Sequence, residues 1–170
     1  MYGSVCVYTN DHRLRLRSLP KQLELGVAES DNEQHEALRF ILNGHLLDCQ
    51  EAMYWQFVAD AAHGRPRRGL NAELFLHKGL KVCVDRIRQN RKGFYHRHHG
   101  TWLMLRSCAR SAFVLLAAER CEDLAPCLPM GWEEDVMDVA RMLGLWKDES
   151  PDVCEMLNIL EALLGTSIRR

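Results

Sequence analysis

The segment from Thr101 to Ala118 constrains the fold more than any other part of the chain. It reads TWLMLRSCARSAFVLLAA, and after its first residue only the pairs Arg106-Ser107 and Arg110-Ser111 interrupt an apolar run. A helix on the surface of a protein carries a polar half, which this segment lacks. We therefore expect a helix over residues 101–120 at the centre of a hydrophobic core.

Helical spacing of apolar residues predicts four further helices around this central one. They cover about residues 31–62, 72–90, 132–146 and 151–165. No series of alternating apolar and polar residues indicates a β-sheet. The sequence thus predicts an all-α domain of about five helices, packed as an irregular antiparallel array. We expect an irregular N-terminal segment (1–30), a helical domain (31–165) and a short tail (166–170).

The expected helix ends follow from local residue chemistry. Ser30 with Glu33 fits a capping box, and Asn71 is a suitable N-cap for the second helix,. Ser150 precedes Pro151, the residue type favoured at the first helical position. We expect Gly165 to stop the last helix and the stretch 64–69, rich in glycine and arginine, to end the first,.

The first long helix carries two apolar strips, so we expect it to contact neighbours on two sides. The main strip contains Leu38, Ile41, Leu42, His45, Leu46, Cys49 and Met53. The second contains Phe40, Leu47, Tyr54 and Val58.

Charge is unevenly distributed, although the formal net charge is only −1. The stretch 85–110 is basic, with Asp85 its one acid, and the stretch 119–161 is acidic. We expect the two stretches to attract each other when the helices pack. Composition also favours a soluble chain that is not secreted, with free, reduced cysteines, because no signal peptide, membrane span or metal-type cysteine spacing occurs,.

Three histidines, His96, His98 and His99, are the candidate metal ligands, since imidazole binds zinc, copper and nickel,. No acid lies between Asp85 and Glu119, whereas a hydrolytic zinc site usually includes a carboxylate. A small metal-dependent enzyme is therefore the alternative hypothesis. We expect instead a polar loop whose imidazoles contact a helix start, with no cofactor and no catalytic role.

Arg106 and Arg110 lie one turn apart on the apolar helix and need anionic partners,. One interpretation is a salt bridge to helix carboxylates such as Asp48, Glu51 or those near Glu133. The other is a pocket for an acidic small-molecule effector. Direct nucleic-acid binding is not expected, because no recognised signature accompanies the basic stretch.

Three stretches resemble the C-terminal part of the regulatory domain of fungal Zn2Cys6 zinc-cluster transcription factors. They are residues 38–58, 83–118 and 128–164, and they cover more than half of the chain. The recurring order is H-x-G-T-W before an apolar helix (98–102), then P-x-G-W (129–132), then an acidic helix that ends in Trp146.

The resemblance implies an all-helical, non-catalytic module that regulates transcription in the nucleus or nucleo-cytoplasm, through protein partners, self-association or a small-molecule effector. Such regulators often control secondary metabolism. The family's DNA reader, with C-x2-C-x6-C spacing, does not occur in this sequence, so no zinc or DNA contact is carried over. We therefore expect a fragment, a truncated gene product or a paralogue without its reader. A plain scaffold or dimerisation module is a further alternative.

Overall fold

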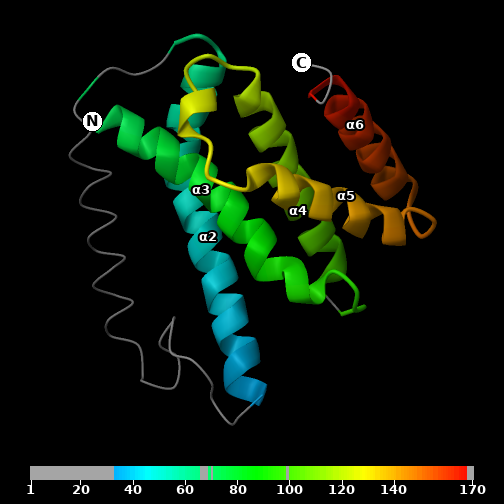
Figure 1. The fold of residues 1–170 in the computed structure, drawn as a ribbon. Helices are drawn as coiled ribbons and strands as arrows, with labels where there is room; N and C mark the ends of the chain where they lie inside the picture. The colour runs from blue at the N-terminus through cyan, green and yellow to red at the C-terminus, as the bar shows by residue number, and fades with distance from the viewer. Residues whose placement is uncertain (1–32, 66–68, 70, 99, 168–170) are drawn as a thin grey trace. The chain divides into compact units, whose positions relative to one another are not determined.

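A computed structural model describes residues 33–65, 69, 71–98 and 100–167, and every regular element within these ranges is helical. The expected all-α fold class is therefore confirmed (Figure 1). In chain order the elements are α2 (Glu33–Ala62), α3 (Ala72–Asn90), η2 (Arg91–Gly93), α4 (Thr101–Glu119), η3 (Ala125–Cys127), α5 (Trp132–Trp146) and α6 (Pro151–Ser167). The chain divides into two compact units, Met1–Met53 and Tyr54–Arg170.

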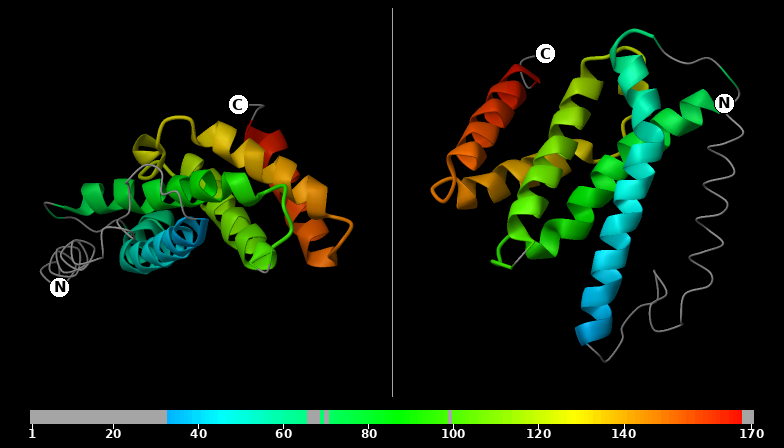
Figure 2. Two further views of the ribbon diagram at one scale, coloured as in Figure 1. Left: turned by 90° about the horizontal axis from the view of Figure 1, so that it is seen from below. Right: turned by 180° about the vertical axis from the view of Figure 1, so that it is seen from behind.

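Helix α4 is the centre of the second unit, as its apolar sequence predicts. It packs against α3, α5 and α6, and Leu105, Cys108 and Leu115 on it are fully buried. Its length and composition would also suit a membrane span, but more than half of that window is buried inside the fold. Core burial thus accounts for its apolar character. The views in Figure 2 show α5 crossing α4, with α6 running beside it.

Helix α3 approaches the end of α2 closely at Gly79. A Cβ atom at Gly79 would lie 2.6 Å from Cγ2 of Val58 and 3.3 Å from Cβ of Tyr54. Tyr54 and Val58 are buried, and the Tyr54 and Phe75 rings stack with centroids 5.9 Å apart. Glycine is therefore required here so that the two helices can come within contact distance.

Most helix ends follow the expectations from sequence. Helix α2 ends at Ala62, and Gly64 then adopts a positive φ of 68°, which glycine permits without steric cost,. Asn71 precedes α3, although its side chain makes no capping hydrogen bond. The proposed capping partner of Glu33, Ser30, lies outside the described residues, as do the segment 1–30 and residues 168–170 of the tail.

The prediction that Gly165 stops the last helix is wrong, because α6 continues to Ser167. The reason is a tertiary contact that local sequence does not reveal. The Arg120 guanidinium donates a hydrogen bond from Nη2 to the Leu163 carbonyl at 3.0 Å, and it also contacts Thr166 Oγ1. A cation at the carbonyl end of a helix is favourable, so Arg120 stabilises this terminus.

The two strips of α2 have different environments. On the second strip, Leu47, Tyr54 and Val58 are buried as expected, but Phe40 is 40% exposed. On the main strip, Leu38 and Ile41 are each almost half exposed, and His45 and Cys49 are also exposed. The expected contact of α2 with neighbours on two sides is therefore not supported at these positions of the main strip.

Candidate functional site

The most organised polar site is a cluster of opposite charges where α3 meets α5. Asp135, only 1% exposed, accepts hydrogen bonds from Nε of Arg88 at 3.1 and 3.0 Å and from Nη2 of Arg91 at 2.8 Å. Arg91 also pairs with Asp138 at 2.6 Å. We call Arg88, Arg91, Asp135 and Asp138 the α3–α5 ion cluster. The hydrogen bond to Asp135 is the main reason why the pKa of Arg88 is raised.

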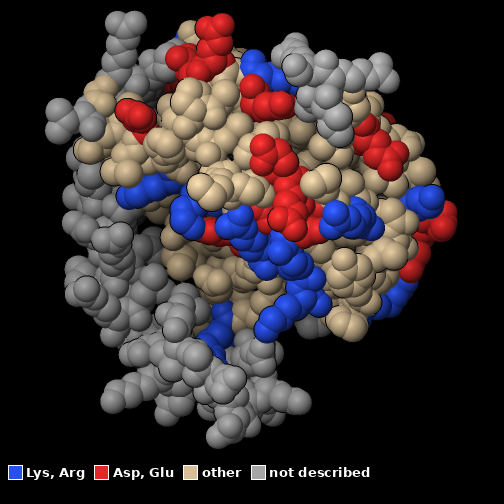
Figure 3. Space-filling view, in the orientation of Figure 1, with Lys and Arg blue, Asp and Glu red and all other residues tan. Residues whose placement is uncertain are grey.

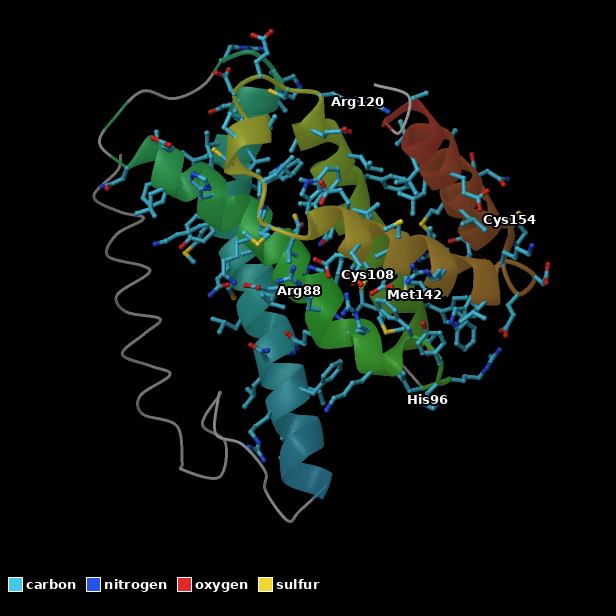
Figure 4. All side chains as sticks on the ribbon, in the orientation of Figure 1. Arg88, His96, Cys108, Arg120, Met142 and Cys154 are labelled. Atoms are coloured by element: carbon cyan, nitrogen blue, oxygen red, sulfur yellow. The ribbon has the colours of Figure 1, made fainter. Side chains whose placement is uncertain are left out.

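The ends of the two helices explain why this cluster forms. Arg88 lies in the last turn of α3, where a cation is favourable, and Asp135 lies in the first turn of α5, where an anion is favourable,. Arg88 also donates from Nη2 to the Met130 carbonyl at 3.0 Å, which holds the turn before α5. In that turn Gly131 has a φ of 78°. Figure 4 shows Arg88 at this crossing.

Other pairs connect the basic stretch to the acidic stretch in the same way. Arg97 pairs with Glu149, and Nη2 of Arg106 lies 2.7 Å from Oδ2 of Asp152. Figure 3 shows basic and acidic side chains side by side over α3 and α5. The predicted attraction between the two stretches is confirmed, and these pairs join segments far apart in sequence.

The two candidate effector-binding arginines lie on the exposed side of α4. Arg106, 67% exposed, makes the salt bridge that one interpretation predicted, but its partner is Asp152 at the start of α6. The predicted partners Asp48, Glu51 and the carboxylates near Glu133 were wrong for this arginine, because the start of α6 lies beside α4. The Ser150 hydroxyl and then Arg106 lower the pKa of Asp152. Arg110 is exposed one turn further along.

The histidines before α4 have different environments. The backbone N–H of His98 donates to Thr101 Oγ1 at 2.9 Å, and that hydroxyl donates back to the His98 carbonyl at 2.7 Å. The Gly100 N–H donates to Nδ1 of His98 at 3.1 Å, so the ring accepts a hydrogen bond at the helix start. His96 is exposed, and His99 lies outside the described residues.

Within the described ranges, no group of three or more His, Cys, Asp or Glu side chains is placed to hold a metal ion. The ring of His98 is also close to backbone on two sides. A Cβ at Gly93 would lie 3.3 Å from its Nε2, and one at Gly100 would lie 3.3 Å from its Nδ1. The imidazole therefore packs against the chain that leads into α4, which is the helix-contacting arrangement expected for this loop.

The sequence does not predict the hydrogen bond that joins the loop before α4 to the end of α5. Trp146 Nε1 donates to the carbonyl of Phe94 at 2.9 Å, and both residues are buried. Arg97 lies over the Trp146 ring at 5.5 Å, and Trp102 meets it edge-on with centroids 6.4 Å apart. The sequence indicates an acidic helix that ends in Trp146, but the partner of Trp146 lies 52 residues away, and no local pattern indicates it.

The cysteines do not form a reactive cluster in the part of the chain that the structure describes, where all six are free thiols. Burial raises the pKa of the Cys108 thiol to about 12, and the nearby Arg86 charge offsets this only in part. Thiolates are the reactive form of cysteine, so Cys108 is chemically inert in the folded protein.

No family model, curated protein or solved structure matches this chain. Its polar groups, as placed by the structure, join helices to each other and to the loops between them. The α3–α5 ion cluster, the α4 entry and the Trp146 contact all perform this task.

Proposed function

We propose that this chain is a helical regulatory module of the kind that lies C-terminally in fungal zinc-cluster transcription factors. It acts in the nucleus by association with protein partners, without catalysis and without a DNA reader of its own. It lowers the activity of an activation domain to which it is attached. The resemblance in sequence motivates this proposal, and the positions of the motif residues support it.

The supporting observation is that each recurring motif contains residues whose contacts or backbone conformation stabilise the fold. In H-x-G-T-W, His98 and Thr101 exchange hydrogen bonds at the start of α4. In P-x-G-W, Gly131 takes a positive φ and Trp132 is buried. The closing Trp146 is hydrogen-bonded to the entry loop of α4. The residues of the three motifs thus hold the segments that lead into α4 and α5, so the resemblance covers positions that matter for the fold.

A tethered reporter tests the proposal. The full chain is placed between a heterologous DNA-binding domain and an acidic activation domain, and transcription is compared with a fusion that carries an unrelated helical domain of equal length. We expect lower transcription with this chain. Equal transcription from the two fusions, at equal protein levels, would overturn the proposal.

A matched pair of tryptophan variants links the effect to the fold. Trp146→Ala removes the hydrogen bond to Phe94 and a buried ring, so it should relieve the restraint. Trp55→Ala removes a ring that is 50% exposed, and it should leave the restraint unchanged. Far-UV circular dichroism of both purified chains reports how much helix each variant retains.

A further inference from the structure

Helix α5 has an exposed outer face that combines methionine and leucine with charged side chains. Its inner face is buried through residues such as Val136, Val139 and Leu143. The outer face carries Met137, 41% exposed, and Leu145, 56% exposed, and Met130 just before the helix is 95% exposed. We call Met130, Glu133, Met137, Arg141, Gly144 and Leu145 the α5 outer face.

Charges on this face are ordered along the helix. Glu133 precedes Met137 by one turn, and Arg141, 60% exposed, follows it by one turn. Residues spaced four apart lie on the same side of a helix, so the order acid, methionine, base runs along one line. Figures 1 and 3 show α5 on the face turned to the viewer, with side chains of both signs over it.

The order of charges on one helix is complementary to the order on a second copy of the same helix that runs in the opposite direction. With a two-fold axis through Met137, Glu133 faces Arg141 of a second copy, and Arg141 faces Glu133 of that copy. An interface with two-fold symmetry requires this kind of self-complementary patch. Arg141 also contacts Asp138 on its own helix, so its guanidinium already has one anionic partner, and Glu133 of a second copy would add another.

Apolar residues and a glycine accompany this charge pattern. Gly144 lies seven residues, about two turns, after Met137 on α5, whereas Met130 lies just before the helix, ahead of Gly131 with its φ of 78°. A Cβ atom at Gly144 would meet nothing within 4 Å, so the space outside this glycine is open. An exposed side chain of a second copy, such as Met130, therefore has room above Gly144, beside Leu145. Arg88 on α3 and Arg91 directly after α3 hold the side of α5 that meets α3.

We propose that the α5 outer face is a self-association surface, on which α5 of a second copy of this chain packs antiparallel with Met137 at the two-fold axis. The charge order and the exposed apolar residues of this face are independent of the proposed regulatory function. The occupant is a second copy, because the charge pattern is complementary to its own reverse.

The test is sedimentation equilibrium of the full chain over a range of concentrations. We expect a monomer–dimer equilibrium in the wild type. Met137→Glu places two carboxylates opposite each other at the axis and should abolish the dimer. Leu103→Glu is the control, because Leu103 on α4 is 75% exposed but lies outside the face, and its dimer should persist.

Charge exchange tests the register. Glu133→Arg alone and Arg141→Glu alone each create like-charge contacts across the axis and should weaken the dimer. The double variant restores opposite charges and should recover it. A monomeric wild type at all concentrations, a dimer that survives Met137→Glu, or a double variant no better than the single ones would overturn the proposal. Circular dichroism confirms that each variant remains helical.

Discussion

Asp135 illustrates how single residues maintain this fold. A buried carboxylate is costly unless hydrogen bonds and opposite charges compensate for the loss of water. Arg88 and Arg91 supply both, and each remains about half exposed, so neither guanidinium loses all its hydration. The sequence places Glu133, Glu134 and Asp135 favourably at the start of α5. Local pattern does not indicate that the third of these is the buried one.

Replacing one arginine of the α3–α5 ion cluster tests this account. Arg88→Leu should lower the free energy of unfolding by about 1–3 kcal/mol, because the buried Asp135 loses the side chain that hydrogen-bonds both of its carboxylate oxygens,. Lys81→Leu is the matched control on α3, where the pair with Asp85 is exposed and local. That change should cost no more than about 0.5 kcal/mol. Urea denaturation measures both, and equal losses would contradict the account.

The contact between α2 and α3 shows what decides packing at the level of elements. Helical periodicity indicates which face of each helix is apolar, and Tyr54, Val58 and Leu80 are buried as that pattern predicts. The short distance between α2 and α3 depends on Gly79, which has no side chain to hold the helices apart. In the sequence this residue is visible only as a weak helix former inside a helical segment.

Two glycine substitutions separate packing from propensity. Gly79→Ala inserts a methyl group against Val58 and the backbone-proximal atoms of Tyr54, so it should destabilise the protein by about 1–2 kcal/mol,. Gly44→Ala, on α2, meets nothing within 4 Å and should gain about 0.5–1 kcal/mol from helix propensity,. Thermal melts followed at 222 nm would compare them. Stabilisation by both substitutions would show that the helices do not approach this closely.

At the scale of the whole molecule, the central position of α4 protects the groups on it. Cys108 is 0% exposed, and its pKa is raised to about 12, whereas Cys49 on α2 is exposed. A reagent that attacks thiolates therefore reaches Cys108 only when the core opens. This makes Cys108 a reporter of global unfolding.

Alkylation with iodoacetamide at pH 8 across a urea series checks this, with peptide mapping to separate the cysteines. Cys49 should react without urea, and Cys108 should react with the same urea midpoint as the loss of helix signal, because both require unfolding. Alkylation of Cys108 in buffer at a rate near that of Cys49 would be inconsistent with a central α4.

The amino-acid sequence by itself determined the all-α fold class, the five α-helices of the described residues and the central place of α4 in the second unit, because apolar periodicity and helix-end chemistry are local properties. It also predicted the attraction between the basic and acidic stretches, since charge acts without exact geometry. Only the tertiary structure decided which residues meet: Arg88 with Asp135, Arg106 with Asp152, and Trp146 with Phe94. It also carried α6 past Gly165 through Arg120. Such pairs join residues more than forty positions apart, and their partners depend on how the helices cross.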